Sequence, residues 1–415
     1  MKSKPLSYTA LIKHSPHLLI FGFLMTFSSS LGQTFFIGAF GPSIQNEFEL
    51  SHSEWGSIYM IGTVLSAVCL PWTGQLIDRF KLKNYTFFVF LGLCASGLFI
   101  SIVPIAWLLI PVIFCLRQSG QGLTSHIAVT TMAKYFSINR GKSIAIAALG
   151  YAVGESFLPL LVVLAISIFS WRQTYGIATG LLFLIFFPLV MWLLSRSSNN
   201  SLKNPDENTA TYKKESEFVK SWTRREMLHH WRFYLIMPAV IAPSFIGTGL
   251  FFHHLTLADA KGWSAIWITG SYWVYAVGSV AASLFFGPLI DRISAVKAVP
   301  LFLIPKIAAL LIIWNFSNPY WAWPYLLLLG LNVGMMYTGI TALWAELYGP
   351  KYLGSIRSFV VAITVLASAL GPPCMGFLID GNISVESICF IFASYCTGAA
   401  VLIKIGLANV KPQQS

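Results

Sequence analysis

The chain has 415 residues, of which 56% are hydrophobic and only 10% are charged, and its formal net charge is +12. Soluble domains carry roughly 25% charged residues, so this composition excludes an ordinary water-soluble protein. The basic excess is typical of membrane-protein loops retained on the cytoplasmic side, and no nucleic-acid-binding motif accompanies it. The sequence therefore predicts a polytopic membrane protein that contacts the lipid bilayer and binds no nucleic acid.

Twelve apolar runs are long enough to cross a bilayer, since a spanning helix needs roughly 20 mostly apolar residues. The first run has no small-residue cleavage site, so we interpret it as a helix rather than a signal peptide. Only Pro104 and a short dip in hydropathy separate the third run from the fourth. The runs lie near residues 18–40, 55–77, 85–105, 106–133, 143–168, 173–195, 233–258, 264–290, 297–316, 320–346, 356–379 and 385–408.

The basic residues indicate how the chain is oriented. With twelve helices, alternate loops fall on opposite sides, and nearly all of the 27 Lys and Arg residues then collect on the side of both termini. The exceptions are Arg117, Arg172, Lys261 and Lys306. Because basic loops stay in the cytoplasm, both termini are predicted to be cytoplasmic.

One polar stretch divides the chain. We predict an N-terminal six-helix bundle over 1–195, a cytoplasmic linker over 196–230 with a short surface helix, and a C-terminal six-helix bundle over 231–415. The six cysteines lie inside apolar runs and lack zinc spacing, and nothing resembles a P-loop. No metal, cofactor or ATP hydrolysis is therefore expected.

The two halves repeat one another. Residues 74–79 read Gly-Gln-Leu-Ile-Asp-Arg, and residues 287–292 read Gly-Pro-Leu-Ile-Asp-Arg at an offset of 213. The same offset carries Gly141 onto Gly354. Parallel halves related by an axis along the membrane normal are a transporter architecture, in which the substrate is held between the halves near the midplane.

These motifs resemble those of the major facilitator superfamily, and the resemblance extends along the whole chain. The signature of its loop between helices 2 and 3 is Gly-x-Leu-x-Asp-Arg-x-Gly-Arg-Arg/Lys, and this chain departs from it at Lys81 and Leu82. Arg117, followed by Gly120 and Gly122, is similar to the family's helix 4 pattern. The resemblance implies an all-α membrane fold of two pseudo-symmetric six-helix bundles. The residues that match the loop signature are Gly74, Leu76, Asp78, Arg79 and Lys83.

A narrower resemblance is to the monocarboxylate porters. Tyr135-Phe136, Arg140, Ala147 and Gly150 partly match their segment leading into helix 5. Those porters also have a lysine in helix 1 and an Asp–Arg pair in helix 8, and this chain has neither.

Arg117 is the leading candidate for substrate binding. An arginine midway along a spanning helix costs ~2.5–3.5 kcal/mol on insertion scales, so it must face protein, water or a counter-ion. Helix 4 lines the central cavity by the resemblance, and a guanidinium suits a substrate carboxylate. Glu155, midway along helix 5, is the candidate proton-coupling residue. A static Arg117–Glu155 ion pair is the alternative interpretation.

Five further polar residues are candidate substrate contacts on cavity helices, with ordinary packing as the alternative for each. Adjacent histidines on helix 7 point about 100° apart, so at most one faces the pathway squarely. His126 is predicted to be a packing residue, and Lys306 to snorkel or to pair locally. The five candidates are Gln33, Gln121, His253, His254 and Asn332.

The repeated motif predicts a gate at the cytoplasmic face. By the resemblance, Asp78 lies near the start of helix 11 and Asp291 near the start of helix 5, where each carboxylate meets the positive end of a helix dipole. A role limited to topology is the alternative. The gating set comprises Gly74, Asp78, Arg79, Arg140, Gly287, Asp291, Arg292 and Arg357.

These features together predict a secondary transporter, and not an enzyme. Its substrate is expected to be a small organic anion such as a carboxylate, with protons as the candidate coupling ion. Efflux of amphipathic, drug-like compounds is one alternative, and a polytopic enzyme acting on lipid-linked substrates is another. Short loops favour a bacterial inner membrane, and the protein is expected to be a monomer.

Overall fold

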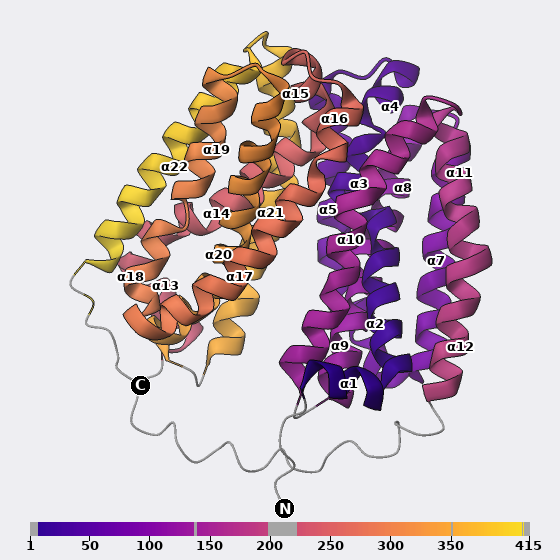
Figure 1. Ribbon diagram of the computed structural model, residues 1–415, viewed down its shortest axis with the longest axis horizontal. Helices are drawn as coiled ribbons and strands as arrows, with labels where there is room; N and C mark the ends of the chain where they lie inside the picture. The colour runs from indigo at the N-terminus through magenta and orange to yellow at the C-terminus, as the bar shows by residue number, and fades with distance from the viewer. Residues whose placement is uncertain (1–6, 137–138, 198–221, 350–351, 409, 411–415) are drawn as a thin grey trace, which may run out of the picture. The chain divides into compact units, whose positions relative to one another are not determined.

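The computed structural model describes residues 7–136, 139–197, 222–349, 352–408 and 410. All regular structure in these ranges is helical, and Figure 1 shows the elements as long coiled ribbons. The chain forms two compact units. The first comprises Met1–Leu50 and Ile58–Thr211, and the second comprises Ser51–Ser57 and Tyr212–Ser415.

The elements before residue 198 cover the first six predicted apolar runs. Several runs are divided into shorter helices by breaks or by a change of helix type. The elements are α1 (Tyr8–His14), α2 (Pro16–Ser28), η1 (Ser29–Gly32), α3 (Thr34–Ala39), α4 (Gly41–Phe48), α5 (His52–Gly74), α6 (Leu76–Arg79), α7 (Leu82–Ile102), η2 (Ala106–Leu108), α8 (Leu109–Leu116), η3 (Arg117–Thr124), α9 (Ser125–Tyr135), α10 (Arg140–Ile166), α11 (Trp171–Leu181), η4 (Leu182–Phe186) and α12 (Phe187–Ser197).

The elements after residue 221 cover the other six runs. The elements are α13 (Arg224–Leu228), α14 (Trp231–Phe252), α15 (His254–Ala260), α16 (Ala265–Gly270), α17 (Tyr272–Ile293), α18 (Ala295–Ala298), η6 (Val299–Leu301), α19 (Ile304–Asn315), η7 (Pro319–Trp321), α20 (Ala322–Tyr348), α21 (Leu353–Asp380) and α22 (Val385–Leu407).

Most of the predicted linker, residues 198–221, lies outside the described residues. Its last part contains α13, which begins with a capping box in which the Thr223 hydroxyl accepts from the Glu226 amide and the Glu226 carboxylate accepts from the Thr223 amide. The three-part division of the chain stays a prediction.

Ten described helices are long and apolar enough to cross a membrane, and α1 with α2–η1 form a further candidate bent by 101°. The predicted all-α membrane fold is confirmed. The predicted helix over 106–133 is interrupted by η3, a π-helical segment between α8 and α9. The count of twelve spans therefore stays a prediction.

The first predicted helix breaks in its middle. The Ser29 hydroxyl donates to the Thr26 carbonyl at 2.6 Å and Gly32 is a poor helix former, so the α-helix tightens into the 3₁₀ segment η1. Gln33 then adopts an extended conformation with φ −87° and ψ 153°, and α3 begins after it. The break leaves backbone groups of this segment available to other partners, which is tolerated at membrane depth only inside protein.

Two glycines bring this break against the π-helical segment η3. A Cβ on Gly32 would overlap the carbonyl oxygen of Leu116, and a Cβ on Gly120 would lie 2.9 Å from the Cα of Gly32. The close approach thus requires the absence of side chains at both positions. It places the carbonyl of Gly32 beside the start of η3.

An ion pair ties α4 to α11 outside the spanning segments. Arg172 donates to Glu47 at 2.8 Å from Nε and 2.6 Å from a terminal nitrogen, and the Trp171 indole also donates to Glu47. The hydrogen bonds from Arg172 hold the pKa of the Glu47 carboxyl below its usual range.

In the second unit, α14 packs against α21 and α22, while α19 packs against α20 and α22. The inner face of α19 is therefore enclosed by protein. Lys306 lies on that face and is only 1% exposed. Of the two interpretations of Lys306, snorkelling to the membrane surface is wrong, because the side chain is buried in the bundle. Local pairing is confirmed, since Nζ donates to the carbonyl of Pro243 at 3.3 Å and to the amide oxygen of Asn332 at 3.5 Å.

Candidate functional site

Arg117 is buried in the first unit at the start of η3, with 3% of its surface exposed. One terminal nitrogen donates to the carbonyl oxygen of Gly32 at 3.0 Å. The guanidinium carbon lies 5.0 Å from the ring centroid of Tyr59, a distance typical of a cation–π contact. The Nε–H is buried and has no partner among the described residues. The guanidinium is thus held by neutral groups and retains donor capacity.

The second buried charge of this unit is Glu155 on α10, which is 7% exposed. Its carboxylate accepts from the Tyr151 hydroxyl at 3.2 Å. Tyr151 lies one turn earlier on the same helix and also within electrostatic range of Arg117. Tyr151 therefore lies near both buried charges.

No ion pair joins Arg117 to Glu155 among the described residues. No direct contact therefore supports the alternative of a static Arg117–Glu155 ion pair. Arg117 and Glu155 therefore do not neutralise one another through a direct contact.

Neighbouring aromatic and hydroxyl groups complete the surroundings of Arg117. The Thr34 hydroxyl lies 2.6 Å from the Tyr59 hydroxyl, and the ring of Phe35 meets Tyr151 edge-on at 5.6 Å. The break between η1 and α3 places both residues there. We define the Arg117 cluster as Arg117, Glu155, Tyr59, Tyr151 and the carbonyl of Gly32.

Two of the three amides predicted to contact substrate, Gln33 and Gln121, lie near members of this cluster in the sequence. Gln33 is 6% exposed, and its Nε2 donates to the Ser29 hydroxyl at 3.4 Å. Gln121 is half-buried, one turn after Arg117 in η3. Both stay candidate substrate contacts.

The two histidines of the second unit have separate partners. His253 bonds the carbonyl of Pro372 on α21 at 2.9 Å. His254 bonds the Tyr272 hydroxyl at 2.7 Å and stacks on its ring. The other ring nitrogen of His254 and the hydroxyl of nearby Tyr325 are buried without a partner among the residues described.

Asn332 is fully buried on α20, where its amide nitrogen donates to the Phe302 carbonyl at 2.8 Å. Its amide oxygen faces Lys306 Nζ at 3.5 Å. Asn332 thus binds neighbouring helices, and its role as a substrate contact stays a prediction.

The gating residues lie at helix ends. Asp78 and Lys134 form an exposed ion pair within the first unit, and a Cβ on Gly74 would lie 3.6 Å from the His126 ring. Arg79, Arg292 and Arg357 are exposed. The side chains of Arg140 and Asp291 lie outside the description, and so no contact is assigned to them.

The predicted contacts of Asp78 with residues 355–358 and of Asp291 with residues 142–143 join the two halves and stay predictions. Gly287 has no neighbour within 4 Å of an added Cβ among the described residues. Its place in a close helix contact also stays a prediction.

Sequence reasoning missed Tyr59, Tyr151, Thr34 and Gly32. Tyr151 carried a signal, because it precedes Glu155 by four residues and so lies on the same helix face. The carbonyl of Gly32 carried none, since its availability depends on where the first helix breaks.

Comparisons with known proteins agree with this architecture. The family model of the Major Facilitator Superfamily matches residues 22–372 and 265–414. A bacterial homolog of the human lysosomal transporter Spinster, in an inward-facing and unoccupied conformation, has a TM-score of 0.65 at 15% identity, covering 95% of this chain and 94% of that one. The nucleoside transporter NupG, solved as a point mutant, has a TM-score of 0.64 at 11% identity, covering 94% of this chain and 99% of that one. No curated protein matches the chain.

Proposed function

This chain belongs to the major facilitator superfamily, and on that premise we propose that it is a secondary transporter that moves a small organic anion, such as a carboxylate, by alternating access. The family and the solved transporters of similar fold support the transporter class. The substrate class and the coupling ion rest on the residues of the Arg117 cluster.

The observation that carries the proposal is the unpaired guanidinium of Arg117. It is 3% exposed, has no carboxylate partner within the described residues, and keeps one buried N–H without an acceptor there. A carboxylate would neutralise this charge and supply the missing acceptor through the bidentate geometry that guanidinium groups favour. The partial resemblance to the monocarboxylate porters points to the same class of substrate.

Glu155 supplies the coupling in this proposal. Glu155 does not pair with Arg117, and Tyr151, which donates to Glu155 at 3.2 Å, is the described residue that interacts with both. A substrate anion on Arg117 disfavours a second negative charge close by and promotes uptake of a proton by Glu155. Anion and proton then cross together.

The test measures ligand binding to the purified protein through its melting temperature. The ligands are a panel of small carboxylates and the corresponding neutral amides. A ligand that binds only the folded state raises the melting temperature in a concentration-dependent way. We expect carboxylates to stabilise the wild type and Arg117→Lys to weaken that binding by about tenfold or more, because lysine cannot form the two-pronged contact.

Arg172→Lys is the matched control, since Arg172 pairs with Glu47 in the same unit and has no place in the site. It should keep wild-type affinity. Equal affinity for amides and carboxylates, or unchanged carboxylate affinity in Arg117→Lys, would contradict an anion site at Arg117.

A further inference from the structure

Lys306 is a buried lysine that the proposed transport mechanism does not use. Its Nζ donates to the carbonyl of Pro243 on α14 at 3.3 Å and to the amide oxygen of Asn332 on α20 at 3.5 Å. Cys396 on α22 lies close enough for an electrostatic contact. A Cβ on Gly247 of α14 would lie 3.6 Å from Nζ. Each of these groups facing the amine is neutral or a weak acid.

The hydrogen-bond count fits a neutral amine. An ammonium has three N–H donors, whereas an uncharged amine has two and a lone pair. Two acceptors face Nζ, and both contacts are longer than the roughly 2.7–2.9 Å that charge-assisted bonds adopt. The packing thus satisfies an uncharged amine and leaves an ammonium short of one acceptor and of any counter-charge among the described residues.

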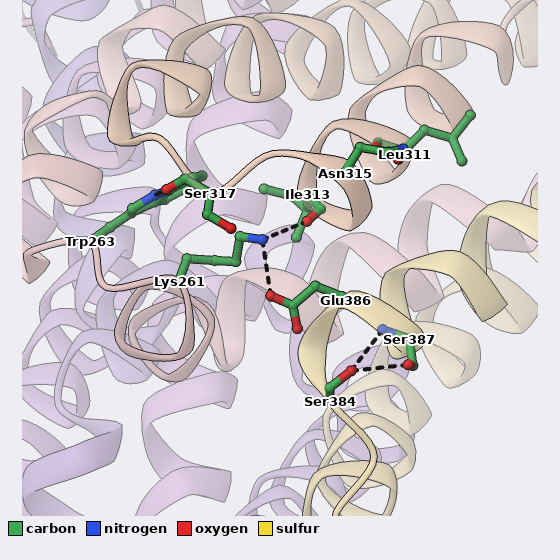
Figure 2. Close-up of polar contacts among 9 residues, drawn as sticks. All are labelled: Lys261, Trp263, Leu311, Ile313, Asn315, Ser317, Ser384, Glu386 and Ser387. Carbon is green, nitrogen blue, oxygen red and sulfur yellow. Dashed lines mark hydrogen bonds and ion pairs between the residues drawn. The ribbon is translucent and has the colours of Figure 1, made fainter.

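Lys261 in the same unit shows the contrasting arrangement (Figure 2). Its Nζ is also buried, but it forms an ion pair with Glu386 at 3.0 Å and donates to the carbonyl of Ile313 at 2.9 Å. Those shorter contacts and the carboxylate suit a charged lysine. The second unit therefore contains one lysine with a counter-ion and, among the described residues, no carboxylate in ion-pair contact with Lys306.

We propose that Lys306 is a proton-binding site of the second unit, uncharged in the packing seen here, and that it takes up a proton when the contacts of α19 with α14 and α20 loosen. In this step the lone pair of Nζ forms an N–H bond with a proton delivered by hydronium, whose O–H bond breaks and leaves a neutral water molecule. The role in transport rests on the proposed function, where this site would be a second proton site besides Glu155. The proton binding itself does not depend on transport.

The test is the melting temperature of substrate-free protein in detergent, compared between wild type and Lys306→Met from about pH 6 to about pH 10, a range that approaches the ordinary lysine value. Because the loosened state binds the proton, acid should destabilise the wild type relative to the variant. The difference, wild type minus variant, should rise with pH by roughly 3 °C or more. Lys297→Met, at an exposed lysine of the same span, should show no such trend.

Asn332→Asp provides a second variant that retains the lysine. It places a carboxylate where the amide oxygen now faces Nζ, and so reproduces the pairing of Lys261 with Glu386. The new carboxylate then compensates the ammonium. The melting temperature of this variant, measured relative to Lys306→Met, should therefore no longer rise with pH. A pH-independent difference for Lys306→Met, or a trend unchanged in Asn332→Asp, would overturn the proposal. Because no substrate is present, a failure of the anion-transport proposal would leave this result intact.

Discussion

At the scale of single residues, Arg117 and Glu155 share one bundle without touching. Arg117 is compensated by a carbonyl and an aromatic face, and Glu155 by a tyrosine hydroxyl. Neutral partners leave a buried charge available for another group, whereas a direct ion pair would consume both. In the proposed mechanism, this separation allows anion binding at Arg117 and proton binding at Glu155 to influence one another.

If Glu155 carries the coupled proton, Glu155→Gln should abolish the pH dependence of net transport while exchange of substrate for substrate persists. The amide keeps the size and the bond to Tyr151 but cannot take up or release a proton. The measurement is flux in liposomes with and without a pH gradient. Glu47→Gln, which changes a carboxylate at the end of the bundle, should keep the wild-type response. A retained gradient response in Glu155→Gln would assign Glu155 a structural role.

The burial of Arg117 followed from the sequence, because a charge in the middle of an apolar run has to face protein. The residues that contact Arg117 could not be predicted from the sequence. Tyr59 and the carbonyl of Gly32 come from other segments, and only the helix break brings them to the guanidinium. Lys306 was predicted to snorkel or to pair locally, and it pairs locally, because its position on α19 turns the side chain toward α14 and α20.

At the scale of elements, two irregular segments build the site. The 3₁₀ turn η1 ends at Gly32, and the π-helix η3 begins at Arg117. π-Helical segments are frequent at functional sites because the extra residue per turn re-aims side chains. Apolar periodicity predicts where a membrane helix runs, but not where its hydrogen bonding changes, so neither irregularity was predictable from the runs.

Gly32→Ala should disrupt this junction. The added methyl group would overlap the carbonyl oxygen of Leu116, and overpacking typically costs about 1–3 kcal/mol. We expect a lower melting temperature and weaker carboxylate binding. Gly180→Ala on α11, where a Cβ meets no neighbour among the described residues, is the control and should be neutral or stabilising. Wild-type binding by Gly32→Ala would mean that the junction does not position Arg117.

At the scale of the whole molecule, the chain is two units whose repeated motif places an aspartate at the same point of each half. The repeat was visible in the sequence because Gly, Leu, Ile, Asp and Arg recur at one offset. Asp78 pairs with Lys134 in its own unit. We propose that it also contributes to a cytoplasmic latch that closes in the outward-open state.

Asp78→Asn should therefore shift the population toward the inward-open state, since a latch stabilises only the state in which it is closed. Cysteines placed in the cytoplasmic half of the cavity should be labelled faster in this variant. Lys134→Gln distinguishes the ion pair of Asp78 from its proposed latch contact, because this variant removes the ion pair but keeps the Asp78 carboxylate. Unchanged labelling in Asp78→Asn, or an equal increase in Lys134→Gln, would rule out a latch based on Asp78.

We propose that the chain carries a small organic anion across a bilayer without chemical change. The most direct measurement is counterflow: purified protein in liposomes loaded with unlabelled carboxylate, without ATP, taking up the labelled compound from outside. We predict saturable uptake that the internal anion accelerates, with the label recovered unmodified and the rate strongly reduced by Arg117→Lys. Conversion of the label to a product, or binding without any flux, would contradict a secondary anion transporter.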